Sequence, residues 1–246
     1  MRVVVLQPGY LPWLGFFDQL DRSDMFVLYD DVQFDKHGWR NRNRIKTRDG
    51  PMWLTVPVRT KGLGKPRNDE VEIDPTQHWA GKHLQAIRTW YGKAPHFARV
   101  FAAIEEVLSR PWARLLDLDR ALMDAALRLL GLERRVFLAS ELGIGGGQTA
   151  RLVAICRHLG ADRYLTGDAA KSYLDEGKFT EAGISVEWHG YKHPRYRQLH
   201  GEFVPYLSIV DLLMNHGAEA LGILTGRLVV EQGAVAHEAA PEDGAV

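Results

Sequence analysis

The stretch "LQPGYLPWLGFFDQL" (residues 6–20) determines the fold predicted for the start of the chain. It overlaps "VVVL" (residues 3–6), a β-branched apolar run that a Pro-Gly pair soon stops, as is typical of a buried parallel strand. Pro12 suits the first turn of a helix, and residues 25–31 form a second apolar run that ends in two aspartates. Together these residues predict a strand–helix–strand unit that opens an α/β fold.

The rest of the chain combines strand and helix patterns with a helical middle. Residues 77–130 have helical periodicity with two interruptions, which predicts three helices, and strand–helix alternation returns from about residue 135. The sequence therefore predicts an α/β fold, with a mainly parallel sheet of five or six strands, flanking helices and a helical insertion. We expect a single domain over residues 1–230. Residues 231–246 contain few large apolar groups, and we expect a disordered tail there.

The composition is that of an ordinary globular protein. The 246 residues include 31 Lys plus Arg and 31 Asp plus Glu, so the net charge indicates neither a nucleic-acid partner nor a membrane surface. A single cysteine forms no internal disulfide and favours a reducing compartment. The first apolar run is too short for a signal peptide or a membrane span. We expect a soluble, cytoplasmic protein, and its oligomeric state stays open.

The carboxyl ends of the predicted strands place several polar side chains at one edge of the sheet. Right-handed crossovers bring these ends together, and ligands bind there in sheets of this type. In the opening stretch, Trp13, Phe16 and Phe17 have the spacing of one apolar helix face, and we expect them in the core. Gln7 and Tyr10 precede that helix, and we expect both to face a ligand.

A polar segment follows the second predicted strand. Asp30 and Asp31 stand at its end, where paired carboxylates bind a cation, act as a base or orient a hydroxyl group, and where turn contacts and ion pairs are the alternative. In the "WRNRNR" segment (residues 39–44), an extended chain puts arginines on one face and amides on the other. Arginine forks bind phosphate or carboxylate, so the candidates for holding an anion or orienting a substrate are Arg40, Arg42, Arg44, Asn41 and Asn43.

Two later segments add candidates. "TGDAAKSY" (residues 166–173) joins a strand end to a helix start, and its Lys171 has the length and charge to reach a phosphate or carboxylate. "EWHGYKHPRYRQLHG" (residues 187–201) has three histidines whose spacing does not match a zinc motif, so no metal site is predicted. In it, His193 and Tyr196 are candidate ligand contacts, and packing of a loop over the sheet is the alternative. No hydrolase nucleophile motif is present.

The chain resembles the WbqC-like protein family over nearly its whole length, up to about residue 225. Members of this family often lie among genes for bacterial surface polysaccharides, so the resemblance implies a role in making or decorating an activated sugar or a related metabolite. It does not itself imply catalytic residues. The segments that carry it are "LQPGYLPWLGFFDQL", "YDDVQF", "WRNRNRI", "WLTVPV", "RLVAICRHLGADRYLTGDAAKSYL" and "YKHPRYRQLHGEFVPYLSIVDLLMNHG".

The opening strand–helix–strand unit is similar, more weakly, to the nucleotidyltransferase-like ligases, including pantothenate synthetase. Those enzymes adenylate a carboxylate and pass the acyl group to an amine. Their helix start carries His-x-Gly-His, whereas the corresponding residues here are Trp13-Leu14-Gly15-Phe16, which keep the glycine and lack both histidines. This departure favours an acyl donor or a sugar nucleotide over ATP as the ligand.

We therefore predict a small-molecule transferase or ligase that forms an amide by attaching an acyl or aminoacyl group to an amine, on an amino sugar or related metabolite of surface polysaccharide biosynthesis. The arginines and Lys171 hold anionic groups, and Gln7 and the asparagines orient the substrate. Asp30 or Asp31, or alternatively His193, is the general base. The other prediction is a non-catalytic ligand-binding or assembly protein of such a pathway. The cofactor is unknown, and the donor (ATP, CoA, aminoacyl-tRNA or nucleotide sugar) stays open.

Overall fold

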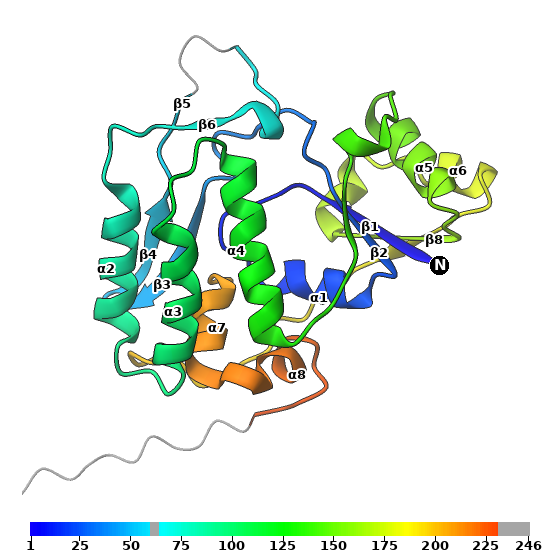
Figure 1. Cartoon of the computed structure of the whole chain (residues 1–246). Helices are drawn as coiled ribbons and strands as arrows, with labels where there is room; N and C mark the ends of the chain where they lie inside the picture. The colour runs from blue at the N-terminus through cyan, green and yellow to red at the C-terminus, as the bar shows by residue number, and fades with distance from the viewer. Residues whose placement is uncertain (60–63, 231–246) are drawn as a thin grey trace, which may run out of the picture.

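A computed structural model of the chain describes residues 1–59 and 64–230 (Figure 1). The tail predicted over residues 231–246 lies outside the described residues. Among the described residues, no helix is both long enough and apolar enough to cross a membrane.

A five-stranded parallel sheet forms the centre of the fold, as the sequence predicts. The strand order is β7-β2-β1-β8-β9, so the chain leaves β1 toward one side of the sheet and later returns to its other side. The change of direction falls between β1 and β8, where open α/β sheets bind ligands. The strands are β1 (Arg2–Leu6), β2 (Met25–Leu28), β7 (Val136–Leu138), β8 (Arg163–Thr166) and β9 (Ser185–Trp188).

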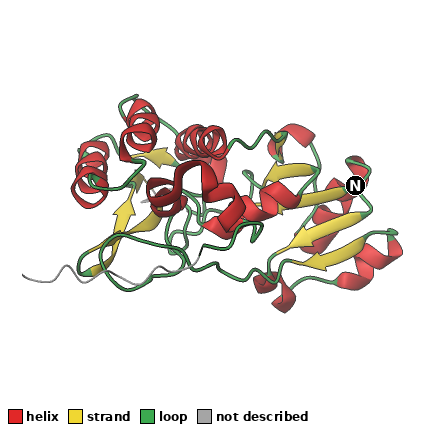
Figure 2. Cartoon of the chain, turned by 90° about the horizontal axis from the view of Figure 1, so that it is seen from below, coloured by secondary structure: helices red, strands yellow, loops and turns green. Residues whose placement is uncertain are grey.

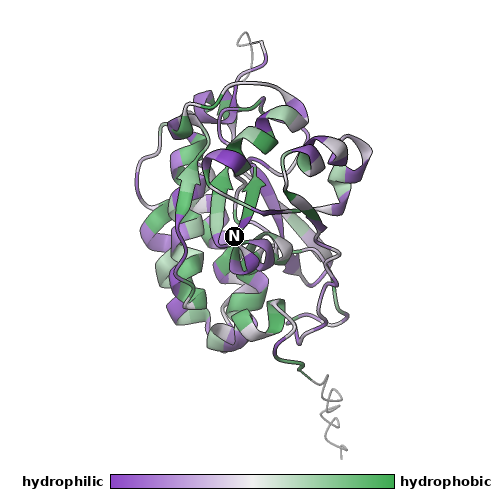
Figure 3. Cartoon of the chain, turned by 90° about the vertical axis from the view of Figure 1, so that its right-hand side faces the viewer, coloured by the Kyte–Doolittle hydropathy of each residue, from purple (hydrophilic) through white to green (hydrophobic). Residues whose placement is uncertain are grey.

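Helices cover both faces of this sheet, and two apolar clusters fill the space beneath them. On one face, Val3, Val5 and Val27 pack with apolar side chains of α5 (Gln148–His158) and α6 (Glu176–Glu181). The opposite face belongs to the larger cluster, which contains α1 (Leu14–Arg22) and the long insertion. Successive strand residues point to opposite faces, so a strand buried on both sides needs the continuous apolar run seen in β1. Figure 3 shows apolar residues gathered on the central strands.

The insertion after β2 contains three helices, as the sequence predicts, and two small antiparallel ribbons. Seen from below in Figure 2, it lies beside the parallel sheet. Its elements are β3 (Arg42–Thr47), β4 (Gly50–Thr55), β5 (Val58–Arg59), β6 (Glu72–Ile73), α2 (Trp79–Tyr91), α3 (Phe97–Leu108) and α4 (Leu115–Leu130). The last two α-helices of the described residues are α7 (Ile209–His216) and α8 (Ala220–Leu224).

Two strands of the insertion, β4 and β5, are not part of the parallel sheet. Among the described residues, β4 pairs with β3 in a hairpin, and the short β5 pairs with β6. The loop of the hairpin is tight because Gly50 adopts a φ of +105°, a conformation that favours glycine. The alternation expected for the arginine- and asparagine-rich segment is present in β3, where Asn43 is buried and Arg42 and Arg44 are partly exposed.

The turn after β1 is fixed onto this hairpin by hydrogen bonds. Leu11 has a φ of +45°, a strained conformation for a residue with a branched side chain. The Asn43 side-chain amide donates to the carbonyl oxygens of Tyr10 and Leu11, at 3.3 and 2.7 Å, and the Tyr10 backbone N–H donates to the carbonyl of Arg40 at 2.9 Å. The C-terminal part joins them, because Ser208 N–H donates to the carbonyl of Arg44.

The packing of α1 gives a test of the fold. Phe17 is fully buried in the larger cluster, at an edge-to-face distance of 5.4 Å from Phe16. We expect Phe17→Ala to lower the free energy of unfolding by about 3–5 kcal/mol, because it removes buried area and leaves a cavity. Chemical denaturation measures the change. Tyr173→Ala, at an aromatic side chain that is 67% exposed, is the control and should change stability little; equal losses in the two variants would contradict this packing.

Candidate functional site

A cleft of about 940 Å³ opens at the carboxyl ends of β1, β2 and β8. This is the point in the sheet where the strand order changes direction, and the volume is that of a small-molecule site. Its walls come from distant parts of the chain: the first turns of α1 and α5, the approach to β3, the 3-10 turn Asp168–Ser172 after β8, and Tyr206 before α7.

Gly15 gives the cleft part of its shape. A Cβ atom on this residue would lie 2.2 Å from a ring carbon of Trp13, so the indole rests directly on the backbone of α1. The space that the absent side chain of Gly15 leaves on α1 is therefore filled by the indole of Trp13 and not by a ligand. Trp13 in turn packs edge-on against Tyr191 at 5.3 Å and against Tyr206 at 5.8 Å.

Two arginines place positive charge in the cleft wall. Arg40 donates from Nη1 to the carbonyls of Gln7 and Pro8, at 3.2 and 3.0 Å, and Arg44 donates from Nη2 to the carbonyl of Tyr206 at 3.2 Å. The Nε atoms of both arginines are buried and have no partner among the described residues. Burial lowers the pKa of Arg40, since desolvation disfavours its charged form. An anion in the cleft would meet the parts of these two side chains that line it, and not the buried Nε atoms.

Gln7 and Gln19 also line the cleft with buried or half-buried amides. The side-chain oxygen of Gln7 accepts a 3.3 Å hydrogen bond from Asn68, so its NH₂ group is left for other partners. Gln19 is 4% exposed; its NH₂ group donates to the carbonyl of Gly15, and its Oε1 has no partner among the described residues. Since unpaired buried polar atoms cost stability, Gln19 is a strong candidate for contacting a ligand.

The other residues expected to orient a substrate lie in the core or have their hydrogen bonds satisfied. Tyr10 is fully buried, and its hydroxyl is 2.8 Å from Nδ1 of His83. Asn41 is buried outside the cleft lining; its NH₂ group donates to the carbonyl of Val56 at 2.8 Å, and its Oδ1 has no partner among the described residues. Asn43 lines the cleft, but its amide group holds the turn after β1 and its oxygen accepts from the backbone of Arg44.

Asp30 and Asp31, the predicted bases, flank the cleft and do not line it. Asp30 is fully buried and accepts hydrogen bonds from the backbone and hydroxyl of Ser140, at 3.0 and 2.5 Å, which joins the ends of β2 and β7. Asp31 pairs with Arg151 of α5. The guanidinium of Arg151 lies 5.0 Å from the centre of the Tyr29 ring, so this ion pair supports an aromatic side chain of the cleft.

His193 acts on the cleft through Tyr206. Its Nε2 accepts a 3.1 Å hydrogen bond from the backbone N–H of Tyr206, while its Nδ1 is 2.8 Å from the carbonyl of Pro194. These partners require the neutral Nδ1–H tautomer, in agreement with the burial that lowers the pKa of His193. Tyr206 has a φ of +57°, and the bonds from His193 and Arg44 hold this strained residue in place.

Three remaining candidates point elsewhere. Tyr196 is buried and donates to Asp211 at 2.9 Å. Lys171 forms an exposed ion pair with Asp168 at 2.6 Å and lies over the ring of Trp188 at 5.3 Å. Arg42 donates to backbone carbonyls of the loop before β3 and packs on Trp53, outside the cleft lining.

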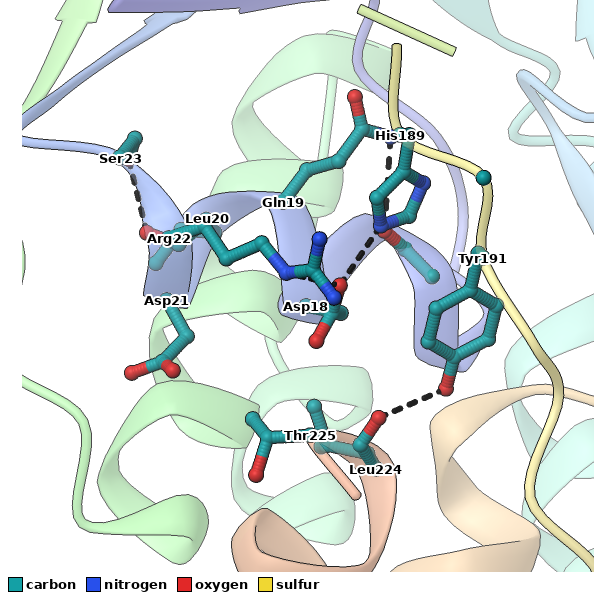
Figure 4. A network of polar contacts seen from close by, with 12 residues as sticks. Asp18, Gln19, Leu20, Asp21, Arg22, Ser23, His189, Tyr191, Leu224 and Thr225 are labelled. Carbon is teal, nitrogen blue, oxygen red and sulfur yellow. Dashed lines mark hydrogen bonds and ion pairs between the residues drawn. The ribbon is translucent and has the colours of Figure 1, made fainter. Parts of the chain in front are cut away.

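A network behind α1 fixes the helix that carries Gln19 and Phe16 (Figure 4). His189, which follows β9, is buried, and its Nε2 lies 2.7 Å from the Asp18 carboxylate. Because a carboxylate only accepts, Nε2 carries the proton. Asp18 also pairs with Arg22 at 2.9 Å, and the ring of Tyr191 stacks on His189 at 5.1 Å while its hydroxyl donates to the carbonyl of Leu224.

Sequence reasoning missed Gln19, Trp39 and Tyr206 as cleft residues. Gln19 gave a signal that could have identified it, because it places an amide beside the apolar stripe of a helix that packs on the sheet. No local sequence pattern marks Trp39 or Tyr206 as cleft residues. They line the cleft because the hairpin and the C-terminal segment pack beside it in the tertiary structure. Among the described residues lining the cleft there is no Asp, Glu, His, Lys or Cys, and the described residues contain no cluster of three or more possible metal ligands.

The structure defines an α/β protein with a cationic, aromatic-walled cleft at the point where its parallel sheet changes direction. The model of the WbqC-like protein family matches residues 7–223. The chain is also 41% identical over 221 residues, 89% of its length and 95% of the relative's, to the uncharacterized protein Rv1507c of Mycobacterium tuberculosis. The chain belongs to the WbqC-like protein family.

Asp119 of α4 is the most unusual charged group near the site. It is 2% exposed, and neither carboxylate oxygen has a hydrogen-bond partner among the described residues. Burial raises the pKa of Asp119 well above its ordinary value, and the nearby Arg40 guanidinium offsets only part of this effect. The native carboxyl group therefore stays protonated at pH values where the unfolded chain ionises.

This predicts that Asp119→Asn stabilises the protein, by more at higher pH. Below about pH 4 both states of the wild type are protonated; above it, only the unfolded state ionises, so the wild type loses up to about 1.4 kcal/mol per pH unit that the variant keeps. Denaturation at several pH values from 4.5 to 7.5 measures the difference. Asp117→Asn, at an exposed position of the same helix, is the control. A constant difference for Asp119→Asn would show that Asp119 is ionised in the native state.

Proposed function

We propose that the protein is a small-molecule transferase that attaches an acyl or aminoacyl group to an amine, on an amino sugar or a related metabolite of surface polysaccharide biosynthesis. One observation carries the proposal: Arg40 and Arg44 line a cleft of about 940 Å³ that has no carboxylate among its described lining residues. Such a cleft favours a substrate with anionic groups, because guanidinium groups bind phosphate and carboxylate in a fork geometry.

The proposed reaction joins the amine nitrogen to the carbonyl carbon of an activated acyl group. A C–N bond forms, the bond from the carbonyl carbon to the leaving group breaks, and the proton of the amine passes to the leaving group or to water. Negative charge develops on the carbonyl oxygen and on the leaving group. The guanidinium groups of Arg40 and Arg44 would stabilise both charges in the partly desolvated cleft.

The same positive field favours the reactive form of the acceptor. An ammonium group beside two guanidinium groups has a lowered pKa, so more of the amine is neutral and able to attack. This reduces the demand on a general base. The roles predicted for Asp30, Asp31 and His193 as bases stay predictions, to be examined with single variants once a substrate is known.

The second candidate is a non-catalytic ligand-binding or assembly protein of the same kind of pathway. The observation that favours it is the absence of carboxylate, imidazole, amine and thiol groups from the described residues lining the cleft. A binding protein needs only the arginines, the amides and the aromatic wall. The two candidates share their ligand chemistry and differ in turnover, so the experiments must measure binding and product formation separately.

Anion binding provides the first test. We expect inorganic pyrophosphate to bind the wild type and Arg44→Gln to bind it about 10- to 100-fold more weakly, the loss of one charge-assisted contact. Isothermal titration calorimetry measures both affinities. Arg48→Gln removes an exposed arginine from the same hairpin, outside the cleft, and is the matched control. Equal affinities for wild type and Arg44→Gln would remove the anion site from the proposal.

Product formation separates the two candidates. The protein is incubated with amino-sugar nucleotides and with acyl phosphate, acyl-CoA or aminoacyl donors, and the acceptor is followed by mass spectrometry. A transferase adds the mass of the acyl group minus that of one hydrogen to the amine. Binding of an acceptor without any product from these donors would support the non-catalytic candidate.

A further inference from the structure

The exposed aromatic side chains of the described chain gather at the mouth of the cleft. Among described residues, the aromatic side chains that reach the exposed class are Trp39, Trp53, Tyr173 and Tyr206, at 41, 43, 67 and 51% exposure. Three of them line the cleft, and the fourth, Trp53, packs on Trp39 with a ring-to-ring distance of 4.8 Å. Exposed apolar area concentrated in one place, beside a cavity, marks an interaction surface.

Arginines lie on these rings. The guanidinium of Arg42 is 4.7 Å from the centre of Trp53, and that of Arg44 is 5.2 Å from Trp39 and 5.7 Å from Trp53. We call Trp39, Trp53, Arg42 and Arg44 the hairpin cluster. Arg44 also lines the cleft, so the cluster continues the cationic wall of the cleft outward along the hairpin.

The three arginines of this region, Arg40, Arg42 and Arg44, form no close ion pair within the described chain. Every hydrogen bond donated by the side chains of Arg40, Arg42 and Arg44 goes to a neutral backbone carbonyl. In the described residues, none of the three has a carboxylate within 4.0 Å, although arginines elsewhere in the chain commonly do. The region is therefore locally positive, although Asp35 and Asp119 act on Arg40 at longer range and the chain as a whole carries equal numbers of acidic and basic residues.

The hairpin holds the cluster in a fixed arrangement. Arg44 and Trp53 are direct partners in the β3–β4 register, and Arg42 and Thr55 form the pair two residues away. Arg42 is anchored at both Nε and Nη2 by carbonyls of the preceding loop. The rings of Trp39 and Trp53 are tilted by 42° relative to each other, so a planar ring stacks on one of them at a time. A preorganised aromatic surface binds such a ring with little loss of side-chain entropy.

We propose that the hairpin cluster binds the base of a nucleoside diphosphate. The base stacks on Trp53 beside Trp39, the two phosphates lie against Arg44 and Arg40, and the group attached to the second phosphate occupies the cleft. This inference rests on the proposed function, whose substrate it assigns to the nucleoside-diphosphate-linked class.

The chemistry of the surface selects this class over its rivals. A free anion has no need of exposed tryptophans, and a neutral sugar has no need of three unpaired guanidinium groups. A nucleotide has both a π-face and anionic groups, and stacking on aromatic side chains accepts every base. A diphosphate balances three cations better than the single charge of an acyl-nucleoside monophosphate does.

Calorimetric titration with pyrophosphate, AMP, ADP and UDP tests the proposal. For the wild type we expect ADP and UDP to bind at least about tenfold more tightly than pyrophosphate, the contribution of one stacked base, and more tightly than AMP. Trp53→Leu should lose this advantage and keep the pyrophosphate affinity within about twofold. Trp188→Leu removes the ring that lies under Lys171, outside the cleft lining, and is the matched control that should retain the advantage.

The outcomes separate this inference from the proposed function. If pyrophosphate binds through Arg44 and the nucleoside diphosphates bind no more tightly, or if Trp53→Leu keeps their full advantage, the base site is wrong and the anion site stands. If AMP equals ADP, the diphosphate assignment is wrong. If nucleoside diphosphates bind as expected but no amide product forms with any donor, the base site stands and the transferase function does not.

Discussion

The side-chain amide of Asn43 is the contact on which the site depends. By donating to the carbonyls of Tyr10 and Leu11, it joins the turn after the first strand to the hairpin of the insertion. Leu11 is left-handed there, a conformation that the rest of the structure must maintain. This contact brings Arg40 and Arg44 to the carboxyl ends of the strands, where the topology of the sheet places a ligand site.

The cleft is costly in folding free energy. Arg40 and Arg44 have unpartnered Nε atoms, Gln19 has an unpartnered oxygen, and both Gln148 and Tyr206 line the cleft with positive φ angles. Such features destabilise a fold unless other contacts compensate for them. Other unpaired buried atoms, such as those of Asn41 and Asp119, belong to residues outside the cleft lining, so these features accompany the cleft and do not by themselves define it. Hydrogen-bonded networks behind the cleft, such as that of His189, Asp18 and Arg22, hold the wall in place.

The net charge of the chain is zero, but the arginines at the cleft make that region locally positive. The basic and acidic residues of the chain are equal in number, and most arginines near the surface of the parallel sheet have carboxylate partners, as Arg2 has Glu187. The arginines of the hairpin do not. The net charge therefore says nothing about whether an anion binds, whereas the distribution of ion pairs does. Since the relative from Mycobacterium tuberculosis is uncharacterized, the functional argument depends on this local chemistry.

The sequence by itself determined the α/β class, the parallel sheet and the helical insertion, because these follow from local apolar periodicity and turn residues. It also predicted that Gln7, Arg40 and Arg44 lie at the carboxyl edge of the sheet, where they line the cleft. Only the tertiary structure decided that Asn43 uses its amide to hold a turn and that Asp31 pairs with Arg151, 120 residues away. Whether a polar group is free for a ligand depends on partners from distant segments, and local sequence patterns do not specify those partners.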